Sequence, residues 1–148
     1  MRGRTVVPGF IDAHAHLSDA AGELGWTRLG GERAATNNPY RKILARCIPV
    51  CFGSDGMPYG PLYGIHSAVN GFFEDQRIST EDAFRAATAG GAHASFEEGL
   101  KGTLEAGKLA DFAILDRDPF GEPEQIAGIR VHSTWIGGQP VYRSHGKR

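Results

Sequence analysis

The sequence predicts a mixed α/β fold, with helices in residues 1–99 and mostly strands in residues 100–148. Two patterns carry this prediction. A helical pattern with a capping residue opens at Ser79, and apolar and polar residues alternate along 129–135 before a Gly-Gly pair. Spacing of apolar residues by three and four indicates a helix, whereas strict alternation indicates a strand. The change of period near residue 100 is the one domain boundary that the sequence suggests.

Composition narrows the class of protein. The chain has 148 residues, of which 41% are hydrophobic and 22% charged, as in a soluble globular domain with a core. Its net charge of −1 favours neither nucleic acid nor an acidic membrane as a partner. No apolar run could span a membrane or act as a secretion signal. We therefore expect a cytoplasmic protein in which Cys47 and Cys51 are reduced core residues, with a disulfide or a metal pair as the less favoured interpretation.

The stretch Thr5–Leu17, TVVPGFIDAHAHL, is the first predicted strand. Asp12, His14 and His16 alternate with small apolar residues, so their side chains project from one face of the strand. Two imidazoles about 6.6 Å apart along a strand can bind one metal ion. Asp12 could be a further ligand, orient a histidine from behind, or cap a turn. A His-x-His pair often occurs by chance, but the Pro-Gly-Phe-Ile-Asp lead-in strengthens the metal interpretation.

The following elements are assigned from turn residues and periodicity. Residues 18–38 are expected to form a loop, and Pro49 to end a helix that begins at Pro39. The remaining elements before residue 79 are a short buried strand at Val50–Gly53 that delivers Ser54 and Asp55, a Gly- and Pro-rich loop at 56–64, and a helix at 65–73.

The clearest helix begins after Ser79, which is its predicted N-cap. Acidic residues occupy its first turn, and Ile78 can pack on Ala83 across the cap. Gly90-Gly91 is expected to end or kink this helix, with a short helical piece at 92–96. The C-terminal elements are a strand at Phe112–Leu115, a loop at 116–123, an alternating strand at 129–135, a two-residue turn at Gly137-Gly138 and a strand at Pro140–Arg143.

Four of these segments resemble one known family, the amidohydrolase superfamily. Residues 5–17 are similar to its first barrel strand, and CFGSD at Cys51–Asp55 is similar to its eighth strand. Residues 77–98 resemble the helices that follow, and residues 101–120 resemble the return into the family's small β-sandwich. The branch that fits is that of family 3-like amidohydrolases, which are metal-dependent hydrolases of non-peptide C–N bonds.

The resemblance implies a partial (β/α) barrel over residues 1–99, followed by a β-rich remnant of the sandwich over residues 100–148. A complete barrel needs about 250 residues. Only residues 18–48 stand in place of six barrel strands, and the family's upstream sandwich segment is also missing, so we expect a truncated barrel. Two parallel strands with open edges and a disfavoured left-handed crossover predict a homo-oligomer, with exchanged elements as one form.

The resemblance also implies roles for the site residues. His14 and His16 would bind a divalent metal, most plausibly zinc, and Asp55 would bind it too. Asp55 would act as general base on the metal-activated water and then pass the proton to the leaving nitrogen. Asp12 would lie behind the ligands. Without the resemblance, an ordinary turn or helix-cap residue would be the preferred interpretation of Asp55.

Two other histidines and two other functions remain open at this point. His66 and His93 are more simply explained as structural or solvated residues than as ligands. The favoured function is hydrolysis of a small-molecule amide. The alternative is a truncated, non-catalytic remnant that serves as an oligomeric metal-binding or interaction module, and a third is a deletion product with no selected activity.

Overall fold

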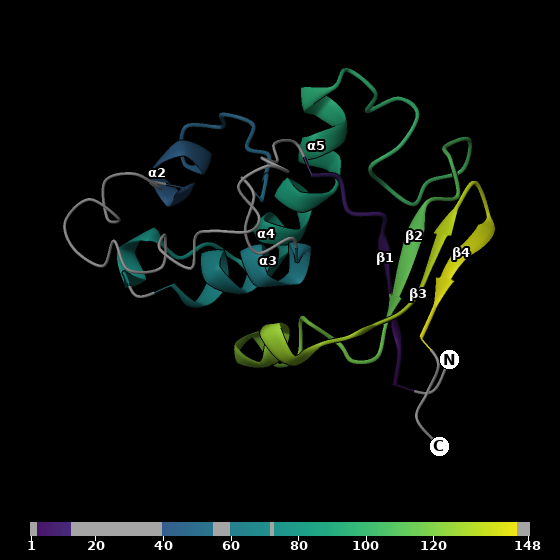
Figure 1. Ribbon diagram of the computed structural model, residues 1–148. Helices are drawn as coiled ribbons and strands as arrows, with labels where there is room; N and C mark the ends of the chain where they lie inside the picture. The colour runs from purple at the N-terminus through teal and green to yellow at the C-terminus, as the bar shows by residue number, and fades with distance from the viewer. Residues whose placement is uncertain (1–2, 13–39, 55–59, 72, 145–148) are drawn as a thin grey trace, which may run out of the picture.

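The computed structural model describes residues 3–12, 40–54, 60–71 and 73–144. It combines a group of helices with one antiparallel sheet (Figure 1), so the predicted mixture of helix and strand is confirmed. In chain order the elements are β1 (Thr5–Pro8), α2 (Tyr40–Leu44), α3 (Pro61–Asn70), the 3-10 helix η3 (Glu74–Gln76), α4 (Thr80–Ala87), α5 (Ala89–Ala94), β2 (Phe112–Leu115), the 3-10 helix η4 (Pro123–Gly128), β3 (Val131–Ile136) and β4 (Gln139–Arg143).

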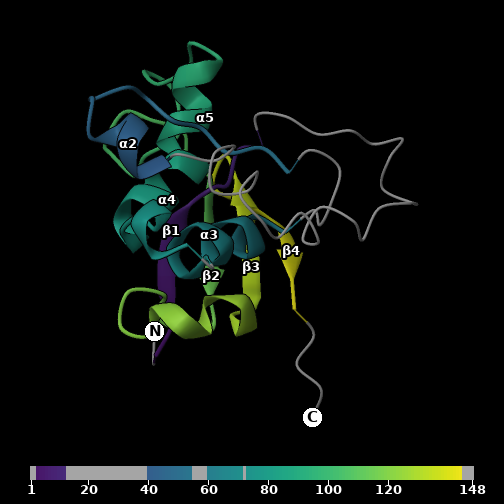
Figure 2. The same ribbon diagram turned by 90° about the vertical axis from the view of Figure 1, so that its left-hand side faces the viewer.

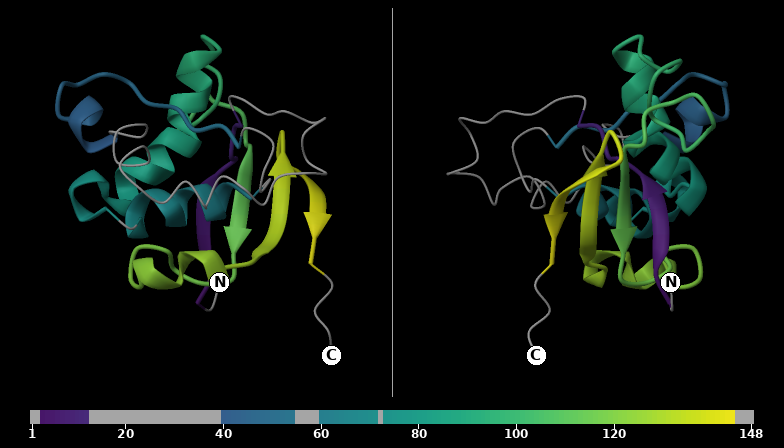
Figure 3. Two further views of the ribbon diagram at one scale, coloured as in Figure 1. Left: turned by 60° about the vertical axis from the view of Figure 1, so that its left-hand side comes forward. Right: turned by 90° about the vertical axis from the view of Figure 1, so that its right-hand side faces the viewer.

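The four strands form a sheet in the order β1-β2-β3-β4, with every neighbouring pair antiparallel. The helices lie against one face of this sheet, and Figure 3 gives a view onto the opposite face; Figure 2 shows the same arrangement from the helical side. The hairpin predicted between β3 and β4 is confirmed. Gly137 and Gly138 have φ of 56° and 75°, the backbone of a type I′ turn, which matches the twist of the strands.

The first strand differs from the prediction. Of the described residues 5–12, Thr5–Pro8 form the strand, and it pairs antiparallel with β2 rather than parallel with residues 50–53. After Pro8 the chain leaves the sheet, and the Gly9 amide donates to Asp111 O at 2.9 Å. The predicted strand at 50–53 is also wrong, because its Phe52 amide donates to a helix carbonyl instead of a strand ladder.

One hydrophobic core joins the sheet to the helices. Residues that face the helices from the sheet include Val7 and Leu115, which are 3% and 0% exposed. Ile78 and Ala83 are buried in the same core, as the helix pattern predicts. The core is made of Val7, Ile65, Ala68, Ile78, Ala83, Phe84, Ala87, Ala113, Leu115, Ile126 and Ile129. Because β1 pairs with β2, sheet and core both extend across the boundary that the sequence suggests near residue 100.

Helix α4 forms where the sequence predicts it. The Asp82 amide donates to Ser79 Oγ at 3.0 Å, and Ser79 Oγ donates to the Asp82 carboxylate at 2.8 Å. This side-chain cap satisfies one of the amides that a helix start leaves open. The predicted break at Gly90-Gly91 is wrong, since both glycines lie inside α5. The chain breaks instead at Thr88, whose φ of −128° and ψ of −86° are not helical.

Three further differences concern ends and exposure. Helix α3 starts at Pro61, four residues before the predicted start, because proline suits the first helical position, where no amide bond is needed. Cys47 and Cys51 are both free and exposed, so the expectation that they are core residues is wrong. Within the described residues no helix is long and apolar enough to cross a membrane.

Candidate functional site

The predicted ligands His14, His16 and Asp55 lie outside the described residues. The described residues nearest to them are Asp12, two positions before His14, and Ser54, directly before Asp55. The geometry of the candidate site therefore has to be built from the two segments that lead into it. We name these the Asp12 segment (residues 9–12) and the Ser54 segment (residues 50–54).

The two segments meet at their ends. The Ser54 backbone amide donates to both carboxylate oxygens of Asp12, at 3.0 Å to Oδ1 and 3.2 Å to Oδ2. These residues are 42 positions apart in the sequence. A charge-assisted hydrogen bond of this kind is stronger than one between neutral groups. The contact thus joins the point where the His-x-His stretch begins to the point where Asp55 follows.

Helix α4 holds both segments at its C-terminal end. The Ile11 amide donates to Ala87 O at 2.9 Å, and the Phe52 amide donates to Ala86 O at 3.1 Å. The last carbonyls of a helix have no partner within the helix, so they are natural acceptors for a neighbouring chain. Adjacent carbonyls of one helix therefore fix the separation of the two segments.

Aromatic contacts pack each segment from the side. The Phe10 ring lies 6.0 Å from the Phe84 ring of α4, and the Phe52 ring lies 5.4 Å from the Tyr40 ring of α2, measured between ring centroids. Burial raises the pKa of Tyr40 above its usual value of 10.0, so its phenol stays protonated at neutral pH. This phenol is a neutral packing group in the fold.

The two spare histidines have structural partners. Asn70 Nδ2 donates to Pro123 O at 2.9 Å and lies 3.1 Å from His66 Nδ1. Asn70 therefore joins the His66 ring to the backbone of η4. His93 Nδ1 lies 3.5 Å from Glu98 Oε1 in an exposed pair. Among the residues described, no group of three or more His, Cys, Asp or Glu side chains could hold a metal ion.

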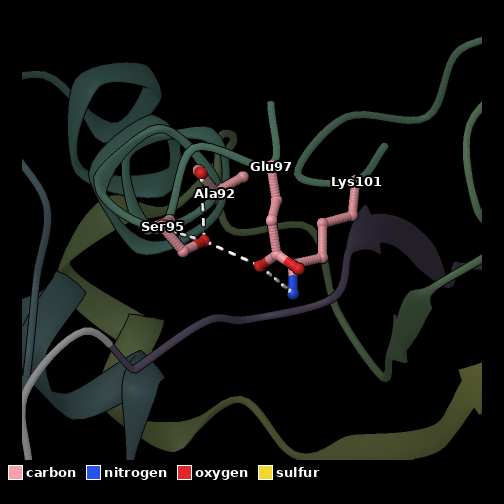
Figure 4. Close-up of polar contacts among 5 residues, drawn as sticks. Ala92, Ser95, Glu97 and Lys101 are labelled. Atoms are coloured by element: carbon pink, nitrogen blue, oxygen red, sulfur yellow. Dashed lines mark hydrogen bonds and ion pairs between the residues drawn. The ribbon is translucent and has the colours of Figure 1, made fainter. Parts of the chain in front are cut away.

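A polar cluster follows α5 (Figure 4). Ser95 Oγ donates to Ala92 O at 3.0 Å and to Glu97 Oε2 at 2.8 Å, and Lys101 Nζ lies 2.6 Å from the same carboxylate oxygen. The hydrogen bonds from Lys101 and Ser95 lower the pKa of Glu97 against the smaller effect of burial. The hydrogen bonds of Ser95 thus fix the turn after α5.

Sequence reasoning missed the residues that hold the two segments, namely Ala86, Ala87, Gly90 and Gly91. Their signal is the run AATAGGA, in which small residues recur four positions apart. Residues four apart lie on one helix face, so small ones there allow another backbone to approach closely. The run begins in the last turn of α4 and continues into α5.

Comparison with known proteins identifies the family. A family model described as "Amidohydrolase family" matches residues 19–142, a range that includes Asp55 but begins after His14 and His16. A Bacillus subtilis protein described as "Putative amidohydrolase YtcJ" is 31% identical over 151 residues, covering 92% of this chain and 28% of the relative.

Solved structures agree on the fold. Guanine deaminase from E. coli superposes with a TM-score of 0.60 at 22% identity, over 71% of this chain and 30% of that one. An adenosine deaminase from Xanthomonas campestris with bound zinc gives 0.54 at 21% identity, over 69% and 27%. The chain spans less than a third of each of these three relatives. It belongs to the amidohydrolase family.

Proposed function

We propose that the chain is the metal-binding part of a hydrolase that cleaves a non-peptide C–N bond in a small-molecule amide. In this proposal His14, His16 and Asp55 hold a divalent metal, and Asp12 lies behind them. The observation that carries it is the contact between Asp12 and the Ser54 amide. Consecutive Cα atoms lie about 3.8 Å apart, so the Asp55 Cα lies at that distance from the Ser54 Cα.

The residues fit a zinc ion by their chemistry. Two imidazoles, one carboxylate and one open position are a common arrangement for catalytic zinc. The Ser54 hydroxyl oxygen is buried and has no hydrogen-bond partner among the described residues. A buried polar atom without a partner is uncommon, so this orphan is consistent with a further polar group where the segments meet. Zinc bound in an adenosine deaminase of similar fold supports the choice of metal.

Asp55 and Asp12 have different roles in the proposed reaction. His14, His16 and Asp55 would hold the zinc, which would supply its known lowering of the pKa of water to about 7. Asp55 would accept a proton from the attacking water and return it to the leaving nitrogen. Asp12 holds the Ser54 segment through its backbone amide and so keeps Asp55 next to the His-x-His stretch.

We also propose that the helical part belongs to a partial (β/α) barrel and that the chain forms a homo-oligomer. Exposure of β4 supports the second point. All five of its residues are exposed, and Val141 and Tyr142 remain 59% and 50% accessible at the edge of the sheet. An uncovered edge strand readily pairs with another chain. Light scattering tests this, and a single monomeric species would count against it.

Metal analysis tests the proposed site. Purified protein is dialysed with zinc and then analysed for bound metal beside His14→Ala and His16→Ala variants. We expect close to one zinc per site in the wild type and a loss of at least tenfold in affinity in each variant. Wild-type protein that retains no zinc above the level of the variants would remove the proposal.

Substrate assays test the reaction separately. Hydrolysis of N-acyl amino acids and lactams is followed by release of the amine, with Asp55→Asn as the control. We expect the substitution to lower kcat by 100-fold or more, because positioned acid–base groups contribute about 10²–10⁴-fold. Stoichiometric zinc without hydrolysis would favour the non-catalytic metal-binding module instead.

A further inference from the structure

We propose that the junction of α4 and α5, Ala86–Gly91, is the positioning element of the metal site, an inference that rests on the proposed function. The junction contacts each segment twice. Ala86 and Gly90 contact the Ser54 segment, and Ala87 and Gly91 contact the Asp12 segment. The two members of each pair are four residues apart. Both segments therefore rest on one short piece of backbone, as Figure 1 also indicates where the chain after β1 reaches α5.

The hydrogen bonds of the junction are specific to these two segments. A helix leaves its last four carbonyls without internal partners, and in α4 these belong to residues 84–87. Thr88 provides donors for the first two of these carbonyls, because its Oγ1 donates to Phe84 O at 2.8 Å and its amide donates to Arg85 O at 3.3 Å. The other two carbonyls accept the Phe52 and Ile11 amides. The end of α4 is thus fully bonded only when both segments are in place.

The glycines set how closely the segments approach. A Cβ on Gly90 would lie 2.2 Å from Val50 O, and a Cβ on Gly91 would lie 2.7 Å from the Ile11 Cβ. Contacts below 3.0 Å do not occur for real Cβ atoms, so a side chain at either position would displace a segment. Gly64 in α3 is different, because a Cβ there meets nothing within 4 Å. Glycine weakens a helix, so two glycines in the six residues of α5 indicate a need for close approach.

Displacement of either segment would change the geometry of the metal site. To relieve the Gly90 clash, the distance between the added Cβ and Val50 O would have to grow from 2.2 Å to at least 3.0 Å. Metal–ligand distances tolerate only about 0.2 Å of deviation. Val50 is four residues before Ser54 and Ile11 directly precedes Asp12, so either shift alters the geometry in which these two residues meet. Loss of groups that orient ligands weakens metal binding by about 10–100-fold.

The test compares Gly90→Ala and Gly91→Ala with Gly64→Ala as the matched control. Zinc affinity is measured by competition with a chelating dye, the cobalt(II)-substituted protein gives the absorption spectrum of the metal site, and far-UV circular dichroism reports folding. We expect zinc affinity to fall 10- to 100-fold and the cobalt spectrum to change in the two junction variants, with Gly64→Ala like the wild type. Folded junction variants that bind zinc with wild-type affinity would overturn the inference.

Two further measurements keep the outcome decisive. If Gly91→Ala fails to fold, the double variant Ile11→Gly with Gly91→Ala removes two of the three clashing atoms, and it should recover folding and part of the affinity. If wild-type protein binds no zinc, the proposed function fails, but the positioning role is still tested by hydrogen exchange. We then expect at least tenfold faster exchange of the Ile11 and Phe52 amides in the junction variants, and unchanged exchange would refute the role.

Discussion

Truncation of Phe84 to alanine is the sharpest test of the core that supports the site. Phe84 is 6% exposed, and its ring lies 6.0 Å from that of Phe10 and 5.2 Å from that of Phe120, measured between centroids. Removal of a buried phenylalanine side chain costs about 3–5 kcal/mol. The substitution Phe84→Leu keeps most of the apolar area and loses the two ring contacts, which are worth about 0.5–1.5 kcal/mol each.

Urea unfolding followed by circular dichroism measures these losses in the free energy of unfolding, and thermal unfolding followed by the same signal gives the Tm. In a chain of this size 1 kcal/mol corresponds to about 2–4 °C in Tm, so Phe84→Ala should lower the Tm by about 6–20 °C. The control is Phe96→Ala, because Phe96 is 90% exposed and should change stability by no more than about 0.5 kcal/mol. A loss below about 1 kcal/mol for Phe84→Ala, or equal losses at the two positions, would show that Phe84 does not anchor the core.

Substitutions at three further positions probe the fold away from the site. Ser79→Ala removes the acceptor of the Asp82 amide and should cost about 1 kcal/mol in urea unfolding, whereas Ser79→Asp should restore most of it; equal stability of all three proteins would contradict the cap. Burial raises the pKa of Asp116, but the backbone and guanidinium hydrogen bonds from Arg130 outweigh it and lower that pKa below 3.8. The stability that Asp116 adds is therefore present above pH 3.8 and is lost as the pH falls through the lower folded-state pKa. Unfolding at pH 3–7 should show the stability difference between wild type and Asp116→Asn shrinking below about pH 4. A difference that stays constant with pH would refute the pairing. Gly137→Ala should destabilise the β3–β4 hairpin by about 1–2 kcal/mol in thermal unfolding because φ is 56°, while Gly137→Asn should cost less; the reverse order would argue against a left-handed turn.

Local signals predicted the elements that local forces decide. The cap at Ser79 and the Gly-Gly turn at 137–138 depend on residues adjacent in the chain, and both form as expected. The predicted helix at 65–73 overlaps the C-terminal part of α3, and its start is four residues late. The Gly- and Pro-rich composition there suggested a loop, although Pro61 is in fact a good first residue of a helix.

Partners distant in the sequence could not be predicted in the same way. Thr5–Pro8 is β-branched and apolar, which suits any sheet, and the pattern does not specify that its partner lies more than 100 residues later in β2. The Val50–Gly53 stretch looks like a buried strand because it is apolar, yet its Phe52 amide bonds to a helix end. Its residues are exposed or only partly buried, so the apolar composition predicted neither the burial of this stretch nor the acceptor of its Phe52 amide.

The same difference between local and distant signals applies to the candidate site. His14 and His16 are predicted as metal ligands from their residue type and spacing in the sequence, whereas their meeting with Asp55 is predicted only through family resemblance. The contact between Asp12 and Ser54 supports that meeting from the described residues on either side. The Ala86–Gly91 run that holds both segments was overlooked, because small residues in a helix are individually uninformative.

The position of the junction on α4 makes stability and metal binding separable. Ala86 and Ala87 are consecutive, so a small movement of the whole helix carries both segments together and preserves the distance between Asp12 and Ser54. Phe84→Ala loosens the packing of the helix on the core, whereas Gly91→Ala pushes one segment and leaves the other in place. We therefore expect Phe84→Ala to lower stability more than Gly91→Ala does, and Gly91→Ala to lower zinc affinity more, when both are measured below the unfolding transition. If the same variant had both the lower stability and the lower zinc affinity, zinc affinity would only follow global stability. The junction would then have no separate role in positioning.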